Sequence, residues 1–105
     1  MKEISSTDAL LLFRGWCDEE ATLFVNTLKS DGEHRAFTAQ IFEVLVNSQT
    51  LMARSGSVEL AFPLEGAKFF LSDERDTDKP EGGRELFLQC DWPSGNRVVF
   101  SLPES

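Results

Sequence analysis

Short apolar segments, each ended by residues that favour turns, make up most of this chain. The longest uninterrupted apolar run is Ala9–Phe13. Turn-forming residues recur at intervals along the whole sequence, at Gly15, Asp31-Gly32, Asn47-Ser48, Ser55-Gly56, Gly66 and Pro93–Asn96. Many short segments separated by turn signals are typical of a sandwich or barrel of β-strands.

The clearest strand pair is predicted at residues 85–102, where apolar side chains recur at every second position from Leu86 to Cys90. Pro93 and Gly95 give the intervening loop a fixed φ and a residue free to adopt positive φ. Residues 57–64 alternate in the same way, and Pro63 should end that strand or place it at a sheet edge. Residues 67–71 predict one more short strand, and the polar run Ser72–Gly83 predicts a loop leading to the hairpin.

The first apolar run predicts a short helix from about Ser6 to Arg14. Ser5 to Asp8 fit a capping box, in which a hydroxyl and an acid satisfy free backbone N–H groups. Gly15 would then stop the helix. A buried strand through Leu10–Trp16 is the alternative, because short apolar runs do not distinguish the two.

Residues 21–28 and 36–46 fit both helical spacing and strand composition. Several Thr and Val residues, with phenylalanines between them, favour a pleated surface. Asp31-Gly32, between the two segments, is a common hairpin turn. We therefore predict two strands; the alternative is a pair of helices at about 18–28 and 33–46.

Together these segments predict a mainly β fold: a small antiparallel barrel or a strongly bent sheet of about five to seven strands, with a short N-terminal helix. If the two ambiguous segments are helical, the fold is α+β. The order of elements over Ser5–Ser72 is similar to that of the Sm-like barrels, without the RNA-contacting motifs of that group. A chain of 105 residues can bury one core, so we expect a single domain spanning 1–105.

Charge makes some classes of partner unfavourable. The chain carries 18 acidic and 10 basic residues, a net charge of −8, and no two basic residues are adjacent. Nucleic acid and anionic membrane surfaces should repel it. No apolar run approaches the ~20 residues of a membrane-spanning helix, and Met1–Ser6 does not resemble a secretory signal. We expect a soluble, cytoplasmic protein.

The residues that carry chemistry are few and scattered. Cys17, Cys90 and His34 are too few and too widely spaced for a zinc site, and the two thiols are expected to be reduced. His34 should be exposed at a turn. Neither a nucleophile-elbow motif nor a phosphate-binding loop is found in the sequence. We predict no catalytic, cofactor or metal site, and favour a non-enzymatic function while leaving enzymatic activity open.

One segment suggests a partner surface. In a regular strand at 36–46, Phe42, Val44 and Val46 lie on the face opposite Ile41, so both faces are apolar and need a second layer or another chain. This predicts an interaction or oligomerisation domain that binds a protein, including a second copy of itself, through Phe42, Val44 and Val46. The alternative is a small-molecule-binding β-barrel in which the extra apolar residues line the cavity. Such a barrel leaves enzymatic activity open.

Overall fold

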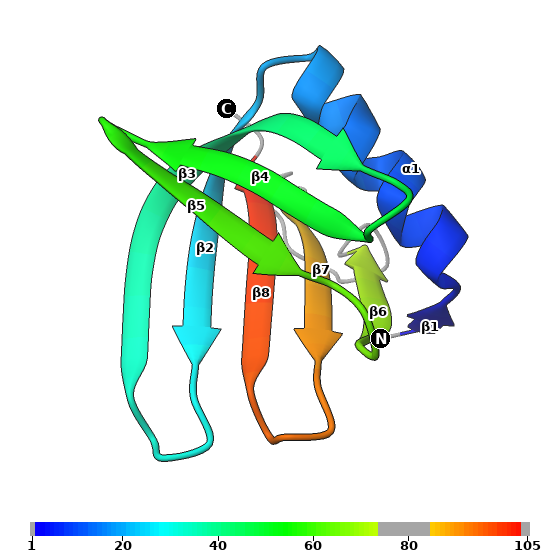
Figure 1. The fold of residues 1–105 in the computed structure, drawn as a ribbon, viewed down its shortest axis with the longest axis vertical. Helices are drawn as coiled ribbons and strands as arrows, with labels where there is room; N and C mark the ends of the chain where they lie inside the picture. Colours follow the sequence, from blue (N-terminus) through cyan, green and yellow to red (C-terminus); the bar gives the residue numbers. More distant parts are fainter. Residues whose placement is uncertain (1, 74–84, 104–105) are drawn as a thin grey trace, which may run out of the picture.

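A computed structural model describes residues 2–73 and 85–103, which form one helix and a single antiparallel sheet of eight strands (Figure 1). The elements are β1 (Lys2–Ile4), α1 (Ser6–Asp18), β2 (Thr22–Leu28), β3 (His34–Leu45), β4 (Thr50–Ser55), β5 (Val58–Pro63), β6 (Lys68–Asp73), β7 (Glu85–Asp91) and β8 (Arg97–Pro103). The strand order is β1-β6-β7-β8-β2-β3-β4-β5, so β1 and β5 are the two edges.

The predicted mainly β fold with a short N-terminal helix is confirmed in its bent-sheet form. The sheet does not close into a barrel, because β1 and β5 do not pair with each other. The eight strands exceed the expected five to seven, because β1 and β4 were not among the segments predicted from the sequence. The predicted hairpin at 85–102 is confirmed as β7 and β8, whereas residues 74–84 of the predicted loop lie outside the described part of the chain.

The helix begins where the capping pattern predicts and ends later than expected. Ser5 Oγ accepts a hydrogen bond from the backbone N–H of Asp8 at 3.1 Å. The helix continues through Gly15 to Asp18 because Trp16 lies on the buried face together with Ala9 and Phe13. Burial of the indole outweighs the cost of about 1 kcal/mol of a glycine inside a helix.

Both ambiguous segments are strands, and the helices at about 18–28 and 33–46 do not form. β2 and β3 pair in register from Thr22 with Gln40 to Leu28 with His34. Alternating burial along β2 places Leu23 and Val25 on the core side. Tertiary burial of alternate side chains thus decides in favour of the strand.

The bend in the sheet is located in β3. The first half of β3 pairs with β2 and the second half with β4, and the register shifts between Ile41 and Glu43. Such a β-bulge bends and twists a strand. As a result, the β4–β5 hairpin crosses in front of β2 and β8 in Figure 1, and the sheet forms two layers. The rings of Phe62 on β5 and Phe100 on β8 meet edge to face at 5.6 Å between the two layers.

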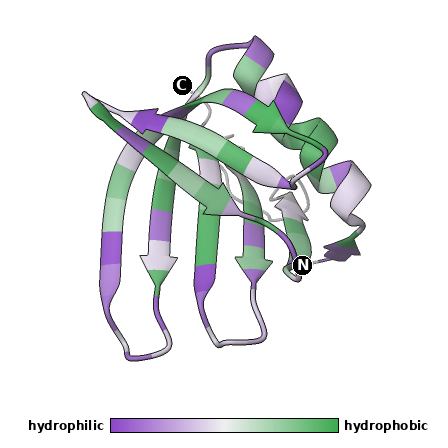
Figure 2. Ribbon diagram, in the orientation of Figure 1, coloured by the Kyte–Doolittle hydropathy of each residue, from purple (hydrophilic) through white to green (hydrophobic). Residues whose placement is uncertain are grey.

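The core lies between these layers and is closed on one side by α1. Phe13 is fully buried, and its ring lies 5.1 Å from that of Phe100 and 5.8 Å from that of Trp16. Hydrophobic and hydrophilic residues alternate along the strands in Figure 2, as expected when one face of each strand is buried. No helix among residues 2–73 and 85–103 is long and apolar enough to cross a membrane.

Because Phe13 is fully buried and packs the helix against Phe100 of β8, Phe13→Ala should lower the free energy of unfolding by about 3–5 kcal/mol. Leu11→Ala is the matched control on the same helix, since Leu11 is 61% exposed, and it should change stability by about 0.5 kcal/mol or less. Urea unfolding monitored by far-UV circular dichroism measures both. Equal losses in the two variants would contradict this account of the core.

Candidate functional site

A groove of about 430 Å³ lies between β5 and the ends of two hairpins. In Figure 1, the lower ends of β2, β3, β7 and β8 extend past β5, so the second layer does not reach them. The groove is lined by Thr27, Leu28, Lys29, Arg35, Phe37, Leu60, Phe62, Pro63, Trp92, Ser94, Asn96, Arg97 and Val98. Most of this lining is apolar, with polar groups at the hairpin ends.

The upper wall of the groove is β5, an edge strand. Leu60 and Phe62 of β5 lie opposite Ala53 and Leu51 of β4, both fully or almost fully buried, so their side chains face the core and the groove. The tight turn before β5 contains Gly56 at φ +61°, a conformation that glycine adopts without steric cost.

Backbone groups of β5 also face the groove side. The backbone N–H of Leu64 donates to the carbonyl of Gln49 at 2.7 Å, in register with the β4–β5 ladder. Hydrogen-bonded and non-hydrogen-bonded pairs alternate along an antiparallel ladder. It follows that the N–H and C=O groups of Glu59 and Ala61 point away from β4, toward the free edge.

Trp92 closes one end of this edge. Its indole Nε1–H donates to the carbonyl oxygen of Pro63 at 3.1 Å, which is the next outward-facing carbonyl along β5. Pro63 itself has no N–H to offer. Trp92 is held in turn by the β7–β8 loop, where its backbone N–H donates to the carbonyl of Asn96 and its carbonyl accepts from Gly95.

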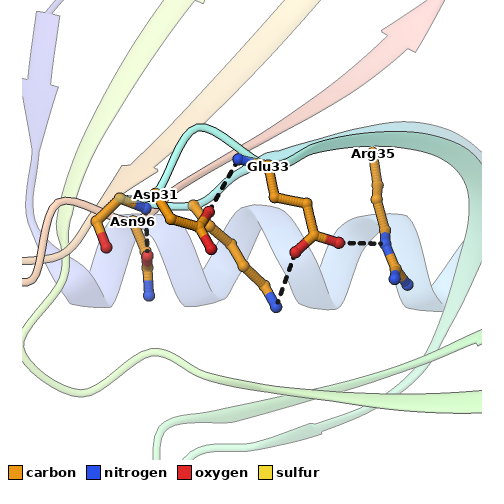
Figure 3. Close-up of polar contacts among 6 residues, drawn as sticks. Asp31, Glu33, Arg35 and Asn96 are labelled. Atoms are coloured by element: carbon orange, nitrogen blue, oxygen red, sulfur yellow. Dashed lines mark hydrogen bonds and ion pairs between the residues drawn. The ribbon is translucent and has the colours of Figure 1, made fainter.

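The two hairpin loops are joined to each other at the far side of the groove. The backbone N–H of Ser30 donates to Asn96 Oδ1 at 3.0 Å, as Figure 3 shows. Gly95 has φ +95°, and a Cβ atom there would lie 3.2 Å from Ser30 Cβ. Glycine therefore permits both the turn and the close approach of the loops.

A small ionic cluster lies on the β2–β3 loop beside the groove. Glu33 Oε1 is 3.1 Å from Arg35 Nε, and Glu33 Oε2 is 3.7 Å from Lys29 Nζ (Figure 3). Asp31 Oδ1 accepts from the backbone N–H of Glu33 at 2.9 Å, which fixes the loop. On the neighbouring hairpin, Arg97 Nε is 2.8 Å from Asp91 Oδ1.

The three residues of the predicted partner surface do not share a face. The bulge in β3 places Val44 opposite Leu51, on the core side, whereas Phe42 packs beneath the guanidinium of Arg54 at 4.9 Å. Val46 follows the end of β3 in a turn and is 51% exposed. The prediction assumed unbroken alternation through 36–46, which the bulge interrupts.

The remaining chemical residues are separate from the groove. Cys17 and Cys90 are free thiols, and Cys90 is fully buried. Burial, and then the charge of Asp91, raises the pKa of the Cys90 thiol far above its usual range, so it remains protonated. His34 is exposed at the start of β3, as predicted. Among residues 2–73 and 85–103, no three His, Cys, Asp or Glu side chains are grouped to hold a metal ion.

Comparison of the chain with protein-family models, with curated proteins and with solved structures finds no match.

The groove was not predicted from the sequence, although two of its signals were present. Pro63 marked a possible edge strand, and Trp92 followed a strand at the start of a loop. The bend in β3 determines where the β4–β5 layer ends. The end of that layer in turn determines which faces of the two hairpins remain uncovered.

Trp92→Phe keeps an aromatic ring in the groove wall and removes the hydrogen bond to Pro63. Loss of one such bond should lower the free energy of unfolding by about 1 kcal/mol. Urea unfolding gives the stability, and the amide spectrum of β5 shows whether the strand shifts. Unchanged stability together with an unchanged spectrum would mean that this bond does not hold β5.

Proposed function

We propose that this protein is a non-enzymatic interaction domain that binds an extended segment of another protein in the groove beside β5. The observation that carries the proposal is the meeting of an edge strand and an apolar groove at one place. An extended peptide that adds to a sheet edge gains main-chain hydrogen bonds, and its alternate side chains enter the adjacent pocket.

The backbone of β5 supplies what such a segment needs. Glu59 and Ala61 each direct one N–H and one C=O toward the free edge, as the register with β4 requires. The bond from Trp92 to Pro63 occupies the next position and limits the added strand to the first part of β5.

The groove supplies the apolar contacts. A strand placed beside β5 would extend the second layer over the uncovered ends of β2, β3 and β8. Its inward side chains would meet Phe37, Val98 and Trp92, which the groove already brings together. Phe37 and Trp92 are only partly buried, and covering them removes apolar surface from water, which stabilises the complex.

A segment from a different protein fits this site better than a second copy of the chain. A single strand can enter between β5 and the hairpin ends. The β5 strand of a second copy brings its own β4 and the attached sheet, which would meet the protruding hairpins. The sequence predicted a protein partner, including a second copy of the chain. Of these two, the geometry of the groove favours a different protein.

The groove lining also favours binding over catalysis. Among its described residues there is no Asp, Glu, His or Cys, so the groove offers no carboxylate or imidazole as a general base.

Blocking the edge tests the proposal. Short random peptides displayed on phage are selected on the folded chain, and the binding of selected peptides is measured by fluorescence anisotropy. Ala61→Pro removes the outward N–H without removing a bond to β4, and should weaken binding at least about tenfold. Ala61→Thr keeps the N–H and is the matched control; it should bind like the wild type.

Three outcomes contradict the proposal: no peptide is selected, Ala61→Pro binds as tightly as Ala61→Thr, or Ala61→Thr also loses binding. Solution mass by light scattering is measured on the same samples. A dimer that Ala61→Pro converts to the 11.8 kDa monomer would show that a second copy occupies the edge instead.

A second candidate function is the binding of a small amphipathic molecule, the alternative expected from the sequence. The groove volume of about 430 Å³ favours it, because small-molecule pockets span roughly 300–1,000 Å³. In that case a medium-chain fatty acid should cause a saturable change in Trp92 fluorescence and raise the melting temperature. If the groove binds only peptides, neither change is expected. The Trp92→Phe variant retains only Trp16, so its spectrum gives the Trp16 contribution to be subtracted.

A further inference from the structure

The charged residues that line the groove are all of one sign. The chain has 18 acidic and only 10 basic residues, yet Lys29, Arg35 and Arg97 are the charged residues in the described lining. This sign is opposite to the net charge of −8. The groove therefore differs in electrostatic character from the chain as a whole.

Neighbouring carboxylates outside the groove lining pair with all three cations. Glu33 is shared by two cations, with Oε1 3.1 Å from Arg35 Nε and Oε2 3.7 Å from Lys29 Nζ (Figure 3). Asp91 pairs with Arg97 at 2.8 Å. Asp31, the third carboxylate of this region, accepts from the backbone N–H of Glu33. None of the three carboxylates lines the groove, so the charged groups that face the groove are the cations.

The geometry of Arg35 suits a further carboxylate. Its contact with Glu33 is made through Nε, and its side chain is 72% exposed. A guanidinium has two more nitrogen atoms, which bind a carboxylate in a two-point arrangement. Charges more than ~8 Å apart are largely screened at physiological ionic strength, so an anion in the groove responds to the charges around the groove and little to the net charge of the chain.

We propose that the segment bound in the groove carries an acidic side chain that pairs with Lys29 and Arg35, next to apolar residues that contact Phe37 and Trp92. This inference rests on the proposed function and names the chemistry of its partner: an extended acidic and apolar peptide. Before the segment binds, Glu33 holds the side chains of Lys29 and Arg35 in place. The carboxylate of the bound segment then pairs with the same two cations.

The test uses the full chain, with short random peptides displayed on phage as the probe. Three proteins are compared in the selection: wild type, Arg35→Glu, and Arg14→Glu as the matched control. Arg14 is exposed on α1 and does not line the groove, and its replacement changes the net charge equally. Circular dichroism and the melting temperature establish that each variant is folded.

The wild type and Arg14→Glu should select peptides in which Asp or Glu accompanies alternating apolar residues. Arg35→Glu should bind the same peptides at least about tenfold more weakly, and added salt should reduce this difference. Acidic peptides that bind Arg35→Glu as tightly as Arg14→Glu would overturn the inference.

The other outcomes separate this inference from the proposed function. Selected peptides without acidic residues, whose binding Ala61→Pro still abolishes, would overturn the acidic partner and leave strand addition at β5 intact. Failure to select any peptide, or binding that Ala61→Pro does not change, would overturn both.

Discussion

The bulge in β3 is the feature on which the rest of this structure depends. One strand pairs with β2 before the register shift and with β4 after it, and therefore belongs to both layers. Without the shift between Ile41 and Glu43, β4 and β5 would extend a single open sheet and leave its inner face uncovered. With the shift, the second layer folds over the first, and Phe62 contacts Phe100 across the core. Phe13 of α1 then packs against the same Phe100 ring.

The same bend leaves the second layer incomplete. It ends at β5, whereas the hairpins of the first layer continue to the loops that Ser30 and Asn96 join. The surface near Phe37 and Trp92 is consequently apolar and only partly buried, with an edge strand beside it. Edge strands are sites of pairing that proteins manage with short length, proline and charge. In this protein, Pro63 and its hydrogen bond from Trp92 block pairing at one end of β5. The outward-facing backbone groups of Glu59 and Ala61 stay available for pairing with another strand.

The sequence predicted the parts of the fold that local pattern decides. Apolar alternation located β7, and Ser5 located the start of α1, because both signals involve neighbouring residues only. It did not predict that α1 passes through Gly15, since that depends on burial of Trp16. It also placed Val44 on the wrong face, because one extra residue at a bulge reverses every position after it. The groove depends on where distant strands end, and no local pattern encodes this.

The most direct test of the account is amide hydrogen exchange along β5, measured residue by residue by NMR in the free protein and with a selected peptide. The account predicts slow exchange at Leu60 and Phe62, which face β4, and fast exchange at Glu59 and Ala61, which face the free edge. Peptide binding should then slow the amides of Glu59 and Ala61. Uniform protection in the free protein, or a bound state in which these two amides stay fast, would contradict strand addition at β5.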